Sequence, residues 1–124
     1  GKVEHIAYIS AVTEDNDPNG NLNKPGGYTA TVYYSDDRIA LDKMIYGDSV
    51  IEQGTDGGGG IEVYATVEDA EKRNNYLAAY DGGLFASGSH TAIGTVLVRT
   101  SNELTASQQK EMEAKIIEML TYVE

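Results

Sequence analysis

The sequence contains no cysteine and no tryptophan, and its apolar runs are short. Without cysteine the chain has no disulfide bonds, thiolate metal ligands or cysteine nucleophiles, although the cellular compartment stays open. The longest apolar run covers only a few residues, far below the ~20 that a transmembrane helix needs. We therefore expect no direct insertion of this chain into a membrane.

Basic residues are also scarce. Nine Lys and Arg stand against 20 Asp and Glu, which gives a net charge of −11. Such a negatively charged chain repels phosphate backbones and anionic lipid surfaces. It also has few basic side chains to displace counter-ions from a phosphate backbone, which is what drives such binding. We therefore expect no nucleic acid among its partners.

What is present is the composition of a globular protein, with 40% hydrophobic and 23% charged residues in a chain of 124. This length allows one hydrophobic core, which predicts a single domain over residues 1–124. Residues 14–27 contain both prolines, four asparagines and three glycines, without a periodic apolar pattern. They predict a long surface loop.

Two segments flank this loop and have the composition of strands. Segment 3–13 has β-branched and aromatic residues at both odd and even positions, which predicts a central strand buried on both faces. Segment 28–34 alternates with a period of two, which predicts a strand with one face on the core. We expect the two strands to pair antiparallel.

Segment 35–54 is ambiguous. Ile39, Leu41, Met44 and Ile45 could form a short helical turn. Residues 49–53 could form a brief edge strand. Four glycines at 57–60 then precede a strand that begins at Ile61. A phosphate cradle is one interpretation of these glycines, but a strand follows them and they lack a lysine. A flexible bend or bulge before the strand is the favoured interpretation.

Two amphipathic segments predict helices, over 67–80 and 105–122. Thr66, followed by acidic residues, is typical of a helix start, and residues 81–83 (Asp-Gly-Gly) end that helix. The apolar stripe of the first helix is Val67, Ala70, Leu77 and Tyr80. That of the second is Met112, Ile116, Ile117, Leu120 and Val123.

Between these helices, residues 87–101 predict a hairpin that turns at Gly94, with Val96 and Val98 facing inward. The order of the predicted elements indicates an α+β fold. We expect a two-layer sandwich in which a mostly antiparallel sheet of five to six strands carries both helices on one face.

The loop holds a partial calcium-binding pattern. Asp15, Asp17, Asn19 and Gly20 occupy its first, third, fifth and sixth positions. Gly26 stands at the twelfth position, where the pattern requires a bidentate glutamate. We therefore expect a turn-rich loop without a bound metal and no cofactor. The alternative is a weak calcium-binding module that uses residues 15–26, with Asp15, Asp17 and Asn19 as ligands.

Few residues suit catalysis. The two histidines, His5 and His90, are too few for a histidine-based zinc site without carboxylates from elsewhere. His90 is close in sequence to Ser87 and Ser89. A catalytic triad uses a serine as nucleophile and a histidine as its general base. Neither serine lies in a G-x-S-x-G pattern. The sequence favours a chain without catalytic residues, and the alternative is a small secreted hydrolase that uses His90 with Ser87 or Ser89.

Arg99 and the nine tyrosines leave further alternatives open. Arg99 faces away from the valines of its predicted strand, so it holds either a carboxylate ligand or, the favoured interpretation, an ion-pair partner within the protein. An exposed row of tyrosines such as Tyr33 with Tyr64 would form an interaction face. Buried tyrosines would instead need partners for their hydroxyl groups.

A resemblance to a known family of domains rests on three segments taken together: 16–33 (NDPNGNLNKPGGYTATVY), 54–82 (GTDGGGGIEVYATVEDAEKRNNYLAAYDG) and 86–116 (ASGSHTAIGTVLVRTSNELTASQQKEMEAKI). Together they resemble the C-terminal domain of secreted proteins and lipoproteins of Gram-positive, often gut-dwelling, bacteria. The resemblance implies an extracellular location on the cell surface, with a lipid anchor on a segment outside this sequence, and it brings no assigned activity. It favours a non-catalytic interaction or spacer module, whose partner is an unidentified protein or an envelope or host ligand.

Overall fold

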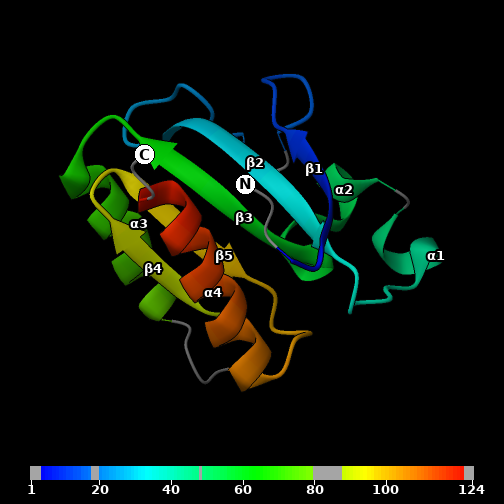
Figure 1. Cartoon of the computed structure of the whole chain (residues 1–124). Helices are drawn as coiled ribbons and strands as arrows, with labels where there is room; N and C mark the ends of the chain where they lie inside the picture. Colours follow the sequence, from blue (N-terminus) through cyan, green and yellow to red (C-terminus); the bar gives the residue numbers. More distant parts are fainter. Residues whose placement is uncertain (1–3, 18–19, 48, 80–87, 122–124) are drawn as a thin grey trace.

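The computed structural model describes residues 4–17, 20–47, 49–79 and 88–121. The strands are β1 (Ile6–Ala11), β2 (Tyr28–Asp36), β3 (Gly58–Tyr64), β4 (His90–Ile93) and β5 (Val96–Thr100). They form one antiparallel sheet in the order β1-β2-β3-β5-β4 (Figure 1). The helices are α1 (Lys43–Tyr46), α2 (Val50–Gln53), the 3-10 turn η1 (Gly54–Gly57), α3 (Val67–Ala78) and α4 (Ala106–Thr121). The α+β class and the antiparallel sheet of five strands confirm the prediction.

The two long helices cover opposite faces of the sheet, which corrects the prediction that both lie on one face. Leu97 and Val98 are neighbours in β5 and therefore point to opposite sides. Leu97 packs in a buried cluster with Ala70 and Leu77 of α3. Val98 packs in a second cluster with Met112 of α4. The sheet is therefore the middle layer of three, as Figure 1 shows.

Both helices begin where their capping residues predict. Thr66 accepts a hydrogen bond from the Asp69 N–H (3.1 Å) at the start of α3. Thr105 accepts from the Gln108 N–H (3.2 Å), and the Gln108 side chain accepts from the Thr105 N–H in return (3.0 Å). This reciprocal pair is a capping box. The expected end of the first helix, at residues 81–83, lies outside the described residues.

The predicted apolar stripes are only partly buried. In α3, Ala70 and Leu77 are buried while Val67 is exposed. In α4, Met112 and Ile116 are buried, Ile117 packs against them and Leu120 is exposed. Tyr80 and Val123 lie outside the described part of the chain.

The first strand is an edge strand, so the prediction of a central strand buried on both faces is wrong. In the sheet of the described residues β1 pairs with β2 alone. Tyr8 is 71% exposed and Ile9 is 65% exposed. Within β1, Ile6 packs against the buried cluster under α4, whereas Tyr8 and Ile9 are not part of the core.

Residues 49–53 form a helical turn, so of the two interpretations left open for segment 35–54 the edge strand does not occur there. Ser49 accepts from the Glu52 N–H (3.0 Å) and so begins α2. The helical turn expected just before it is confirmed as α1, whose N-cap Asp42 accepts from the Met44 N–H (2.9 Å). The hairpin is confirmed as well, since β4 and β5 pair antiparallel and Gly94 has a φ of 59° between them.

The glycines at 58–60 are part of β3, so the prediction of a bend before the strand is wrong. The register places Gly59 opposite Tyr34 and Gly60 opposite Tyr33 in β2. The hydroxyl of Tyr34 donates to the Arg99 carbonyl of β5 (3.0 Å), so its side chain spans β3 at Gly59. A Cβ atom at Gly59 would lie 2.2 Å from that hydroxyl oxygen and 2.2 Å from the Arg99 carbonyl oxygen. The glycine makes room for the aromatic ring.

A buried ion pair joins the end of β2 to α4. The Asp36 carboxylate accepts from the Arg38 Nε (2.9 Å), Nη2 (2.8 Å) and backbone N–H (2.9 Å). The Arg38 Nη1 also contacts the Glu111 carboxylate of α4 (3.4 Å). Burial alone would raise the pKa of Asp36, but the hydrogen bonds from Arg38 outweigh it and the pKa lies below its usual range.

We expect Gly59→Ala to lower the free energy of unfolding by about 3 kcal/mol, because the added methyl group collides with Tyr34 and with backbone of β5. Gly60→Ala is the matched control, because its Cβ would meet its nearest neighbour, the Val32 carbonyl oxygen, at 3.3 Å. Urea unfolding of both variants measures the difference. Equal losses would show that the close approach at Gly59 is unimportant.

The ion pair of Asp36 also predicts a pH dependence of stability. A carboxyl group with a lowered folded-state pKa stabilises the fold above its unfolded pKa of about 4, and this stabilisation is lost as the pH falls through the folded-state value. Asp36→Asn lacks this contribution. We expect wild type to exceed the variant in unfolding free energy at pH 7, and the gap to shrink below about pH 4. A gap that is constant from about pH 7 to about pH 2 would contradict the assignment.

Candidate functional site

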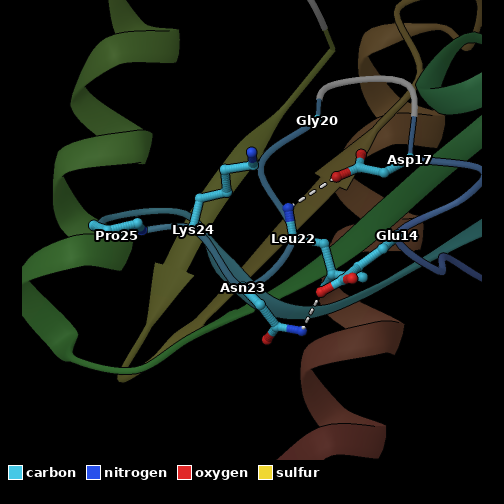
Figure 2. Close-up of a pocket in the computed structure, with 7 residues that line it drawn as sticks. All are labelled: Glu14, Asp17, Gly20, Leu22, Asn23, Lys24 and Pro25. Atoms are coloured by element: carbon cyan, nitrogen blue, oxygen red, sulfur yellow. Dashed lines mark hydrogen bonds between the residues drawn. The ribbon is translucent and has the colours of Figure 1, made fainter.

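Loop 14–27 encloses a pocket of about 430 Å³ (Figure 2). Its lining residues are Glu14, Asp17, Gly20, Leu22, Asn23, Lys24 and Pro25. The side chain of Asn23 donates to the Glu14 carboxylate (3.3 Å), and Leu22 packs against the buried cluster under α3. The pocket is therefore a hollow whose lining is attached to the core through Leu22.

Asp17 organises this loop from inside. One carboxylate oxygen accepts from the backbone N–H groups of Asn21 and Leu22 (both 2.8 Å). The other accepts from the hydroxyl of Tyr28 at the start of β2. Both carboxylate oxygens thus accept hydrogen bonds from donors of the chain itself.

Of the other candidate calcium ligands, the structure describes Asp15 alone. Asp15 is exposed, and Asn19 lies outside the described residues. Among the residues that the structure describes, no group of three or more His, Asp or Glu side chains is placed to hold a metal ion. The loop geometry therefore gives Asp17 a structural role.

The structure does not bring Ser89 and His90 together as a catalytic pair. The Ser89 Oγ is 2.6 Å from the Thr100 Oγ1, and the Ser89 N–H donates to Gln109 of α4 (2.9 Å). The His90 Nδ1 is 2.5 Å from the Asn74 Oδ1 of α3. Because α3 and α4 cover opposite faces of the sheet, the serine and the histidine point to opposite sides. Ser87 lies outside the described residues.

Arg99 forms the ion pair that the sequence favours. Its Nη1 is 3.3 Å from the Glu62 carboxylate, and Arg73 of α3 approaches the same carboxylate (3.8 Å). The Tyr64 hydroxyl donates to Glu62 as well (2.5 Å). Burial, followed by the charge of Glu62, raises the pKa of Tyr64 well above its usual value, so this donor stays protonated. A buried ion pair with these partners holds β3, β5 and α3 together.

Of the two alternatives for the tyrosines, the exposed row of Tyr33 and Tyr64 does not occur, because both side chains are buried. Tyr64 packs edge to face with Tyr28, with ring centroids 6.3 Å apart. Tyr33 faces Gly60 across the strand pair. A period of two marks a strand but does not say which of its faces the neighbouring elements cover.

The outer edge of β1 has no strand beside it within the described residues. The N–H groups of Tyr8 and Val12 donate to β2, to the Ser35 Oγ (3.1 Å) and the Thr31 carbonyl (3.0 Å). Because these groups alternate in direction along an antiparallel strand, the N–H and C=O groups of Ile9 and Ala11 point away from β2. The sequence of β1, IAYISA, contains no charged residue and no proline.

This edge has few of the features by which edge strands avoid pairing, although its register shifts between Ile6 and Tyr8 and α2 contacts β1. Such strands are usually short or carry lysine, proline or a covering element. β1 has exposed Tyr8 and Ile9 and an uncharged sequence of six residues. Helices α1 and α2 lie at the same end of the sheet (Figure 1), and Met44 and Ile45 of α1 are also exposed. The uncharged, apolar composition of residues 6–11 is the sequence signal for this surface.

Comparisons of the chain with family models, with curated proteins and with solved structures find no match. The resemblance to a C-terminal domain of Gram-positive secreted proteins therefore stays a prediction. Within the described ranges no helix is both long enough and apolar enough to cross a bilayer.

We expect Asp17→Ala to lower the free energy of unfolding by about 1–3 kcal/mol, because two backbone N–H groups and the Tyr28 hydroxyl lose their acceptor. Asp15→Ala is the matched control and should change it by less than about 0.5 kcal/mol. Thermal unfolding in millimolar calcium and in millimolar magnesium should give the same melting temperature. A calcium-specific rise that Asp17→Ala abolishes would instead support the calcium-binding alternative.

Proposed function

We propose that this chain is a non-catalytic interaction module that binds a partner protein by strand addition at the edge of β1. In strand addition an extended segment forms main-chain hydrogen bonds with an exposed sheet edge, and side-chain contacts provide selectivity. The observation that carries the proposal is the unpaired, uncharged edge of β1 with exposed Tyr8 and Ile9.

The geometry of β1 supplies what such a partner needs. Ile9 and Ala11 offer N–H and C=O groups that face away from β2, while Tyr8 and Ile9 offer apolar contacts on the two faces of the strand. Strand β1 is itself paired with β2, so the edge is already extended before a partner arrives. A preformed strand binds with less loss of conformational entropy than an unstructured segment.

Two further observations support this function. The separation of Ser89 from His90 speaks against one of the two pairs in the hydrolase alternative, and the other, Ser87 with His90, lies partly outside the described residues. The resemblance to a terminal domain of secreted proteins and lipoproteins is in keeping with a binding role at the cell surface.

A neutral peptide with strand-forming sequence, acetyl-SSVTVTVSS-amide, tests the proposal. Titrated into the isotope-labelled protein, it should shift the amide resonances of Ile9 and Ala11 and slow their hydrogen exchange, because these donors gain acceptors. The same peptide with N-methyl groups on alternate residues of one edge should bind much more weakly. Shifts confined to other parts of the sheet, or no shifts at millimolar peptide, would overturn the proposal.

A further inference from the structure

We infer that the strand which adds to β1 belongs to a different protein and carries lysine or arginine beside Glu14 and Asp15. This inference rests on the proposed function and specifies the chemistry of the partner. Three features support it: the uncharged centre of the binding edge, the unequal compensation of charge at its two ends, and the repulsion between two copies of this chain.

The acidic groups at the two ends of β1 differ in how they are paired. At the start of the strand Glu4 lies 3.2 Å from the Lys115 ammonium, and Asp37 lies 2.9 Å from the His5 ring. At the other end Glu14 and Asp15 follow β1 closely and are both exposed. Neither forms an ion pair with a basic residue in the part of the chain that the structure describes. Glu14 and Asp15 therefore leave negative charge near the end of β1 without an ion pair among the described residues, while Lys24 lines the same pocket as Glu14.

A partner strand that follows the edge of β1 passes this negative end. Lysine or arginine at that end of the partner would approach Glu14 and Asp15 and gain attraction, whereas acidic residues there would be repelled. The centre of the partner strand lies against IAYISA, which offers no charge to pair with. The complementary sequence is thus neutral or apolar in the middle and basic at one flank.

A second copy of the chain fits this edge poorly. If two β1 strands paired antiparallel about their centres, Glu14 and Asp15 of each copy would approach the start of the other strand, where Glu4 already pairs with Lys115, so the opposition to a second copy comes from the net charge. Each copy carries a net charge of −11, so approach is opposed at long range. The charge distribution favours a partner of opposite sign.

The test compares three peptides that share one core and differ only at the flanks: KKVTVTVKK, SSVTVTVSS and EEVTVTVEE, all capped at both ends. At low ionic strength we expect the basic peptide to bind about 10-fold more tightly than the neutral one, and the acidic peptide to bind most weakly. The advantage of the basic peptide should fall as salt is added, because the exposed charges are screened.

The double variant Glu14→Gln with Asp15→Asn tests whether the preference for the basic peptide arises from these two carboxylates. Both substitutions preserve side-chain shape, and the amide that replaces the Glu14 carboxylate keeps an acceptor oxygen for the Asn23 side chain. We expect the variant to bind the basic and the neutral peptides with nearly equal affinity. The matched control is Glu68→Gln with Glu71→Gln, which removes the same charge from exposed positions of α3, a helix that contacts β3, β4 and β5. This control should keep most of the preference for the basic peptide.

The outcomes separate the inference from the proposed function. Binding of all three peptides at Ile9 and Ala11 with equal affinity would overturn the basic-flank inference and leave strand addition intact. Absence of binding by every peptide would overturn both. Ile9→Pro removes an outward N–H without removing a bond to β2, and it should abolish the binding of the basic peptide. A concentration-dependent dimer in sedimentation, lost in Ile9→Pro, would overturn the inference by showing that a second copy is the partner.

Discussion

The central strands depend on one close contact, in which the side chain of Tyr34 spans β3 at Gly59 and its hydroxyl reaches the Arg99 carbonyl of β5. Burial raises the pKa of Tyr34 far above its usual value, so the hydroxyl remains a donor. One side chain thereby joins three strands, and only a residue without a Cβ atom leaves room for it. The glycines of β3 have no side chains to pack, and the ring of Tyr34 from β2 covers the backbone at Gly59 instead.

The buried charges of this protein are used for structure. Glu62 is neutralised by Arg99 and Arg73 on the α3 side of the sheet, and Asp36 is neutralised by Arg38 on the α4 side. Each pair ties a strand to a neighbouring element, so removal of one partner would leave an unpaired buried charge. The two buried carboxylates, Glu62 and Asp36, are both paired in this way, which gives them a structural role.

The elements that were predictable from sequence are those set by nearby residues. Thr66 and Thr105 mark the two long helices through caps within three residues, and Gly94 marks the hairpin. What sequence could not give depends on distant contacts. Residues of both parities are apolar in β1 and in β5, yet β5 is buried because helices cover both its faces, whereas β1 is an edge. The strand character of Gly58–Gly60 likewise depends on tyrosines far away in the sequence, Tyr33 and Tyr34.

The uncharged edge of β1 has a consequence for the behaviour of the protein in solution. At neutral pH the net charge of −11 keeps copies apart, so an edge without lysine or proline is tolerated. The sequence has an isoelectric point near 4.4, and there the repulsion between molecules vanishes while β1 remains unchanged. Mild acid should therefore convert the same edge into a nucleus for ordered aggregation, with strands stacked edge to edge.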